Sequence, residues 1–408
     1  MKKKYRSISR RTFLGQASCA AVSATPILST LLNLRMANAA VASTTDPMDY
    51  RALVCFFFGG GNDSFNMLIP KGNTEYNEYA TTRSDQSIAQ NSILALNGVH
   101  NGKTLGVHPG MPEIQSLYNS GRLAFVSNVG TLVDKSVKVA DVIAGDKIPT
   151  GLFSHADQIM QWQTSIPENT SSTGWGGRLA DLLSPCNVGA NVSMNISLAG
   201  TNVFQSGVNS VSYEIESGGN GSIALDQYVS MSPTLAALNA TAVNSLMDVQ
   251  YSNLFQRAFA ERHRNAVDAS AEFGAAIGGQ NLTTIFSDNG ISQSFHMVAK
   301  TIAARQTLNM KRQTFFIMFG GFDHHDELLN SQAAMLPIIS KAMSEFDAAM
   351  TELGINDKVT TFTASDFART LTSNGKGTDH AWGSNQMVMG GAVNGGQIYG
   401  TYPDLGLG

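Results

Sequence analysis

Cysteine is scarce in this 408-residue chain, which has three, at positions 19, 55 and 186. No two of them have the short spacing of a structural zinc site, so a cysteine-based metal site is excluded. A disulfide between Cys55 and Cys186 would suit an oxidising compartment. Cys55 is flanked by Val54 and Phe56 in an apolar run, and we therefore favour two unpaired or buried thiols.

Basic charge is also scarce once the N-terminus is set aside. Residues 1–39 hold seven of the 27 Lys and Arg residues and none of the 31 Asp and Glu residues, so the remaining chain has a net charge of −11. So acidic a protein is a poor partner for nucleic acid and for anionic lipid. Beyond residue 39 no apolar run is long enough to span a membrane, so we expect no stable membrane insertion of the mature chain.

The N-terminus has the features of an export signal. After several lysines the chain reads Ser-Arg-Arg-Thr-Phe-Leu at 9–14, a modestly apolar stretch follows, and Ala37-Asn38-Ala39 offers the small residues of a cleavage site. Twin arginines followed by Phe-Leu favour the Tat route, which carries folded proteins. An uncleaved anchor or a chance Arg-Arg pair is the alternative. We predict a twin-arginine signal peptide at 1–39 and a periplasmic or extracellular protein.

The remaining chain indicates an α/β fold. The continuous apolar run at 51–58 predicts a strand buried on both faces, and the runs at 124–130, 314–319 and 358–363 predict three more strands. Between the last two lies an apolar helical stripe, made by Leu336, Ile339, Met343, Phe346 and Met350. Pro337 is tolerated there if it falls in the first turn, and Gly354 is expected to end the helix.

Acidic residues follow three of these strands. Asp63, Asp323 and Asp366 come just after a strand, and His325 and His380 lie close in sequence to two of them. The strand–helix–strand unit makes its two strands parallel, which brings their carboxyl ends to one edge of the sheet. Each aspartate alone could be a helix cap or turn residue. Clustered carboxylates, however, repel one another unless cations bind among them. A pair of divalent metals held by Asp and His is the simplest explanation.

At these residues the sequence resembles an exported family, the domain of unknown function 1501, which is placed in the alkaline phosphatase/sulfatase-like superfamily. The matching segments are 58–66, 107–110, 154–155, 162–164, 173–175, 320–325, 365–370 and 377–380. The resemblance implies one α/β domain over 40–408, a three-layer sandwich with a mostly parallel central sheet. Members of the family run on for another segment, so a truncated C-terminus is a further expectation.

The resemblance also implies a two-metal site. One metal would be held by Asp63 and Asp366, and the other by Asp323, His325 and His380. The ions expected are zinc, manganese or calcium. His324 competes with His325 as a ligand.

The superfamily attacks its substrates with a Ser, a Thr or a modified Cys. Ser154 is our first candidate nucleophile, because it precedes a predicted helix whose N-terminus favours developing negative charge, although it could equally be a helix cap. Ser64 is the second candidate. No cysteine lies in a sulfatase-type modification motif, which disfavours ordinary sulfatase chemistry. Arg369 could clamp a substrate anion or pair with the acidic edge, and His155 and His108 could line the pocket or be ordinary buried histidines.

Two functions fit these features. The first is an exported metal-dependent hydrolase of phosphate or sulfate esters, acting on a small anionic ester or a polymer. The alternative is a non-catalytic exported protein that binds a ligand, polymer or partner at the same edge. Metal content distinguishes the two.

Overall fold

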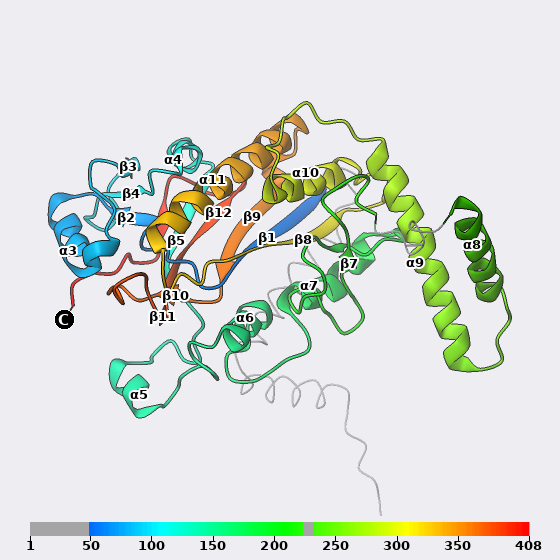
Figure 1. The fold of residues 1–408 in the computed structure, drawn as a ribbon, viewed down its shortest axis with the longest axis horizontal. Helices are drawn as coiled ribbons and strands as arrows, with labels where there is room; N and C mark the ends of the chain where they lie inside the picture. The colour runs from blue at the N-terminus through cyan, green and yellow to red at the C-terminus, as the bar shows by residue number, and fades with distance from the viewer. Residues whose placement is uncertain (1–48, 223–231, 408) are drawn as a thin grey trace, which may run out of the picture. The chain divides into compact units, whose positions relative to one another are not determined.

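The central sheet is built from the apolar strands that the sequence indicates. The structure is a computed structural model, and it describes residues 49–222 and 232–407, so the twin-arginine segment at 1–39 lies outside the described residues. Tyr50–Gly408 form one compact unit. Within the described residues, eight strands pair in the order β13-β5-β12-β9-β1-β8-β6-β7 (Figure 1). These strands are β1 (Arg51–Gly59), β5 (Leu123–Val129), β6 (Asn195–Ser197), β7 (Tyr213–Glu214), β8 (Arg312–Gly320), β9 (Val359–Ser365), β12 (Ser384–Met389) and β13 (Ile398–Tyr399).

The sheet is mostly parallel. β1 lies between β8 and β9 and runs parallel to both. β12 is antiparallel to its two neighbours, β9 and β5. The remaining pairs, β6 with β8, β6 with β7 and β13 with β5, are parallel. The predicted parallel relation of the strands at 314–319 and 358–363 is thereby confirmed, with β1 inserted between them.

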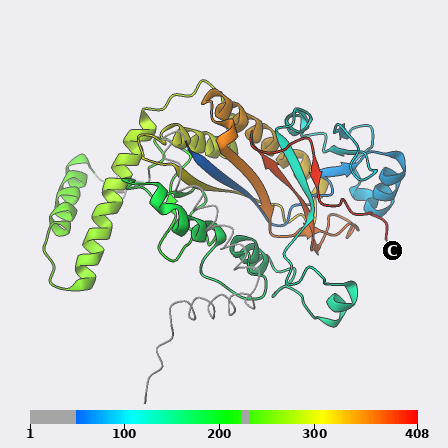
Figure 2. The same cartoon turned by 180° about the vertical axis from the view of Figure 1, so that it is seen from behind.

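Helices cover both faces of this sheet, which gives the three-layer α/β arrangement that the resemblance implies (Figures 1 and 2). The α-helices of the described residues are α3 (Asn73–Arg83), α4 (Pro112–Asn119), α5 (Val139–Ala144), α6 (His155–Thr164), α7 (Trp175–Leu183), α8 (Pro233–Met247), α9 (Leu254–Gly278), α10 (Gly290–Ala303) and α11 (Leu328–Glu352). α4, α10 and α11 lie along one face, and α6 and α7 along the other.

Alternate residues of β1 show how the two faces are packed. Phe56 points toward α10, where its ring meets Phe295 edge-on at 5.1 Å. Phe57 belongs to a second buried cluster, with Phe204 and Phe316, against which Trp162 and Trp175 pack from α6 and α7. Burial on both faces explains why the sequence run is continuously apolar rather than alternating.

Smaller strands flank the main sheet. β2 (Leu68–Pro70), β3 (Leu94–Ala95) and β4 (Leu105–Val107) form a three-stranded antiparallel sheet. β10 (Ala368–Arg369) pairs with β11 (His380–Ala381), so that Arg369 lies opposite His380. This short pair brings two residues from separate loops to the same place.

The helix before β9 is longer than the sequence pattern indicates. α11 begins at Leu328, so Pro337 lies inside the helix, and the expectation that it falls in the first turn is wrong. The apolar stripe that predicts the helix begins only at Leu336, one residue before the proline. The turns before Leu336 were therefore not predicted. Gly354 follows the helix with φ of 65° and ends it as expected.

One expectation about the cysteines holds. Cys55 and Cys186 are both free, and Cys55 is buried, as we favoured. In the described part of the chain, no helix is both long and apolar enough to cross a membrane.

Candidate metal centre

The carboxyl edge of the sheet gathers the polar residues that follow its strands. Asp323 comes three residues after β8, and Asp366 comes directly after β9. Because β8 and β9 both run parallel to β1, their ends meet at one edge. Gly60, just beyond β1, has φ of 116° and donates its N–H to both oxygens of Asp366, at 3.1 Å each. The predicted placement of Asp323 and Asp366 agrees with this geometry.

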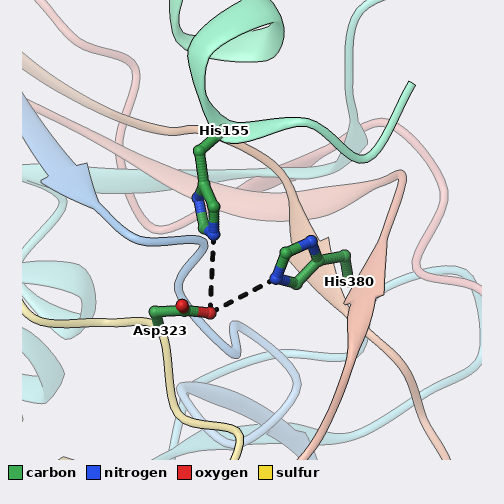
Figure 3. Close-up of side chains that lie close together, drawn as sticks. All are labelled: His155, Asp323 and His380. Carbon is green, nitrogen blue, oxygen red and sulfur yellow. Dashed lines mark hydrogen bonds and ion pairs between the residues drawn. The ribbon is translucent and has the colours of Figure 1, made fainter. Parts of the chain in front are cut away.

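Three histidines converge on one oxygen of Asp323. The distances from Oδ1 of Asp323 to Nε2 of His325, His380 and His155 are 3.0, 3.3 and 3.5 Å. The three rings come from different parts of the fold, since His155 begins α6, His325 follows β8 and His380 begins β11. Figure 3 shows His155 and His380 pointing at Asp323 from two sides.

The other nitrogen of each ring is held by an acceptor. Nδ1 of His155 lies 2.7 Å from Oδ2 of Asp366, and Nδ1 of His325 lies 3.0 Å from Oδ1 of Asp379. Nδ1 of His380 lies 2.8 Å from the backbone carbonyl of Phe153. A carboxylate or a carbonyl oxygen can only accept, so each Nδ1 carries the hydrogen. With the hydrogen on Nδ1, the Nε2 of each ring offers a lone pair that can bind a cation.

This tautomer assignment fits a bound cation. Nε2 of His325 and Nε2 of His380 lie 2.9 Å apart, close enough to share a hydrogen or a cation. Nε2 of His155 is buried and makes no hydrogen bond. Ligand atoms of His155, Asp323 and His380 all lie within 4.8 Å of one another. Metal-bound histidines commonly donate the far ring nitrogen to a carboxylate or carbonyl, as all three rings do. These residues could hold a metal ion.

Arg369 is a buried residue that contacts the centre through Asp323. Its guanidinium is fully buried and forms an ion pair with Oδ1 of Asp323. Its other hydrogen bonds go to the backbone carbonyls of Gly60, Gly61, Phe322 and Thr378. Of the two roles considered for Arg369, this geometry matches the partner of the acidic edge, because little of its donor capacity remains for a substrate.

The carboxylates of the site have different electrostatic surroundings. Partial burial would raise the pKa of Asp323, but the hydrogen bond and charge of Arg369, with His325 and His155, outweigh it and lower the pKa. Burial raises the pKa of Asp366, against the hydrogen bonds from His155 and Gly60. The hydrogen bond from Asn374, followed by that from His325, lowers the pKa of Asp379.

Asp63, the first predicted metal ligand, is engaged elsewhere. Oδ2 of Asp63 accepts a hydrogen bond from Arg83 at 2.7 Å, and both side chains are fully buried. Thr378 Oγ1 donates to the same oxygen at 3.1 Å. Asp63 lies in the turn beyond β1 rather than at its end, and the structure does not bring it to the three histidines.

The candidate nucleophiles have structural contacts. Ser154 is the N-cap of α6, where its Oγ accepts from the N–H of Asp157 at 3.4 Å. Ser64 is fully buried, and its Oγ accepts from the N–H of Asn385 at 2.8 Å. Ser154 directly precedes His155 and is half-buried, so it is the candidate nearer to the centre in sequence.

His324 and His108 do not join the centre, whereas His325 does. His324 is buried, neither of its ring nitrogens has a hydrogen-bond partner, and burial lowers its pKa. His325 is the member of this pair that joins the centre. His108 is buried with its Nδ1 accepting from Gly110, and burial lowers its pKa to about 4, which matches the reading of an ordinary buried histidine.

Sequence reasoning underestimated two residues. His155 had been weighed as a pocket or buried residue, not as a ligand, because it follows no strand and reaches the centre from the first turn of α6. Asp379 appeared only within the matching segment 377–380. The available signals were the segment Ser154-His155 before a helix and the pair Asp379-His380, in which a carboxylate and an imidazole are adjacent.

The fold and centre define a mostly parallel α/β protein with a His/Asp cluster at the carboxyl edge of its sheet. The chain belongs to the family described as Protein of unknown function (DUF1501), whose model matches residues 50–408. The resemblance seen in the sequence is thereby confirmed. No curated protein matches the chain significantly.

Several solved structures are similar to this chain at low identity. The crystal structure of Ps i-CgsB shares 12% identity over 87% of this chain and 69% of that chain, with a TM-score of 0.34. The lipoteichoic acid synthase LtaP from Listeria monocytogenes shares 8% identity over 88% and 70%, with a TM-score of 0.33. A mutant TAB5 alkaline phosphatase with Mg bound shares 11% identity over 86% and 94%, with a TM-score of 0.28. Because these identities and TM-scores are low, we derive the chemistry of the centre from its own geometry.

Proposed function

We propose that this chain is an exported metal-dependent hydrolase of phosphate or sulfate esters. The observation that carries the proposal is the orientation of three imidazoles. Each has its Nδ1 on an acceptor and its Nε2 beside one oxygen of Asp323. Metal-bound histidines commonly share this arrangement, with the far ring nitrogen held by a carboxylate or a carbonyl.

The donor set favours zinc. Imidazole nitrogens suit zinc and its transition-metal neighbours, whereas calcium prefers oxygen ligands. His155, His380 and Asp323 would hold one cation, with His325 beside them and with manganese as the second choice. A second cation would need Asp63 and Asp366, and these side chains already pair with Arg83 and with His155 and Gly60. A divalent cation at this centre would supply a Lewis acid for the oxygen of an anionic ester.

The chain itself would orient the reactants. Asp366 and Asp379 fix the rings of His155 and His325, and Arg369 fixes Asp323. Ser154 remains the candidate nucleophile, since it adjoins His155 at the N-terminus of α6. The side chains of His155, His325 and Asp379 are 33%, 45% and 58% exposed. A centre this open could accept an ester on a polymer as well as a small ester.

A specific observation favours the non-catalytic alternative. The hydroxyl of Ser154 caps α6, and that of Ser64 is buried against Asn385. If neither hydroxyl attacks a substrate, the same centre would bind an anionic ligand without cleaving it.

Metal content and esterase activity test the proposal together. We expect purified protein to hold about one zinc per chain by elemental analysis and to hydrolyse 4-nitrophenyl esters of phosphate or sulfate. His155→Ala should lose the metal and the activity, whereas the control His263→Ala, on α9, should keep both. Protein that holds no metal and gains no activity with zinc or manganese contradicts the proposal. Bound metal without hydrolysis supports the binding alternative.

Export by the Tat route would let the metal enter before the membrane is crossed. This part of the proposal rests on Arg10 and Arg11 in the N-terminal sequence. Replacing both with lysine should retain the protein in the cytoplasm, which fractionation measures. Unchanged export of the double variant contradicts it.

A further inference from the structure

The proposed centre is unusually rich in negative charge for a site that takes an anion. Three carboxylates, those of Asp323, Asp366 and Asp379, contact its histidines. One guanidinium, that of Arg369, pairs with Asp323. At neutral pH these groups sum to two negative charges, which one divalent cation would only cancel.

Little other positive charge is available to a substrate. The guanidiniums of Arg369 and Arg83 are fully buried and paired with Asp323 and Asp63. Among the segments that carry the ligands in the described structure, Lys376 is an exposed cation, in the loop before Asp379. Asn374 ties that loop to the centre by donating to the carbonyl of His325 at 3.0 Å.

A nearby carboxylate offsets this lysine. Asp326 is exposed and directly follows His325, so Asp326 and Lys376 contribute opposite charges to the mouth of the centre. In the described segments that carry Asp323, His325 and His380, the positive charge that meets a substrate therefore comes mainly from the metal, and the three carboxylates around it limit that charge.

We infer that the substrate of this centre carries a single negative charge, as a sulfate monoester or a phosphodiester does. The inference rests on the proposed function. A phosphate monoester carries two negative charges at neutral to alkaline pH, and the second charge would face the carboxylates, because the guanidiniums of Arg83 and Arg369 are already paired. Like-charge contacts are a common means of rejecting a competing ligand.

We call this preference for a single negative charge the charge rule. The net reaction and its final product follow from it. In the net hydrolysis, either directly or after an ester first formed on Ser154, the oxygen of water bonds to sulfur or phosphorus, the ester oxygen leaves with its electron pair and takes a proton, and an alcohol is released. A sulfate ester gives sulfate and a proton. A phosphodiester gives a phosphate monoester, whose second charge makes it a poor substrate, so hydrolysis stops there without release of inorganic phosphate.

Two esters that differ by one charge test the inference. Methyl 4-nitrophenyl phosphate carries one charge, and 4-nitrophenyl phosphate carries two at pH 8.5, with the same leaving group and central atom. We expect the zinc-loaded protein to show a kcat/KM at least about tenfold higher for the singly charged ester. 4-Nitrophenyl sulfate in the same assay distinguishes the sulfate class from the phosphodiester class. A higher kcat/KM for the doubly charged ester overturns the inference.

Binding provides a readout that is independent of turnover. Monomethyl phenylphosphonate and phenylphosphonate have one and two charges, and calorimetry on zinc-loaded protein should show tighter binding of the first. If no ester is hydrolysed, the proposed hydrolase function fails, and this comparison still decides the charge rule. Tighter binding of phenylphosphonate, or binding of neither compound, overturns it.

A charge variant beside the centre gives a matched control. Asp326→Lys adds two positive charges without removing a residue of the cluster, so we expect the preference for the singly charged probe to fall several-fold. Asp357→Lys makes the same change before the start of β9, at the opposite edge of the sheet, and should leave the preference unchanged. Equal effects of the two variants contradict a charge rule that belongs to this centre.

Discussion

Phe153 adopts a backbone conformation that bulky residues rarely take. Its φ is 70°, in the left-handed region, which is unfavourable by about 1–2 kcal/mol for a residue with a side chain. Its carbonyl accepts from Nδ1 of His380 at 2.8 Å, and its N–H donates to Oε1 of Gln158 at 2.6 Å. The strained residue thus fixes the tautomer and the direction of one histidine.

The first prediction is that the backbone of Phe153, not its ring, matters for metal binding. Phe153→Gly relaxes the left-handed conformation and should leave zinc affinity within a few-fold. Phe153→Pro cannot reach a positive φ and removes the N–H, so the carbonyl should move away from His380. We expect a loss of zinc affinity of about 10- to 100-fold, measured by competition with a chelator. Equal zinc affinities for the two variants would contradict this role.

At the residue scale, the sequence identifies ligands that follow strands and misses those that do not. Asp323 and Asp366 could be grouped because parallel strands share a carboxyl edge, and His325 and His380 were added because they lie close in sequence to these aspartates. His155 reaches the centre from the start of α6, and no sequence pattern sets where a helix docks. The sequence does not reveal the partner of Asp63 either, because Arg83 comes from the end of α3. The roles assigned to Ser154, Ser64 and Arg369 stay predictions.

α11 is the element that links the loop before α10 to the sheet. Glu352, at its last residue, accepts hydrogen bonds from the N–H groups of Thr283 and Thr284 at 2.7 and 2.8 Å. Glu345, two turns earlier, accepts from the N–H and hydroxyl of Ser287. Two carboxylates on one helix thus hold a loop that has little secondary structure of its own.

The second prediction concerns the acid stability of this contact. Hydrogen bonds, first from the N–H of Thr283 and then from the Thr284 side chain, lower the pKa of Glu352 from 4.5 to about 2. A carboxyl with a lowered folded-state pKa stabilises the fold above its unfolded pKa, and this contribution is lost as the pH falls through the folded value. Glu352→Gln should therefore be less stable at pH 7 and should show a flatter loss of stability between about pH 4.5 and pH 2.

Denaturant unfolding at a series of pH values measures this effect. Glu261→Gln, on the exposed surface of α9, is the matched control and should follow the unmodified protein. If Glu352→Gln and the unmodified protein have parallel stability profiles below pH 5, the carboxylate does not hold the loop.

Element-level prediction from sequence succeeded where burial was complete. β1 and β9 were anticipated to within two residues because their apolar runs are continuous or end at polar residues. The true start of α11 was missed, because its first turns carry polar residues and a proline follows them. The antiparallel insertion of β12 between β5 and β9 depends on long-range packing that local sequence patterns do not contain.

At the scale of the whole molecule, the third prediction links metal binding to stability. The centre joins residues of α6, of β11 and of the loop after β8, which are together only in the folded chain. A ligand that binds only the folded state stabilises it, by about 2.7 kcal/mol at a concentration of 100 times its Kd. We expect zinc to raise the Tm of the full protein by several degrees, as measured by calorimetry.

The same experiment on two variants checks the origin of the shift. His325→Ala should abolish the zinc-dependent rise in Tm, and His263→Ala should retain it. A rise that persists in His325→Ala would assign the stabilising zinc to another place on the chain.

The central position of β1 also sets the timing of folding. Arg51 pairs with Arg312 of β8, and Ala52 pairs with Val359 of β9. β1 is therefore made early, while both strands that cover its edges are made late. At a synthesis rate of about 5–20 residues per second, β1 waits roughly 10–50 s on the ribosome for its first neighbour. During that time a nine-residue, phenylalanine-rich strand has unpaired edges. Such a nascent chain should be a strong client for ribosome-associated chaperones.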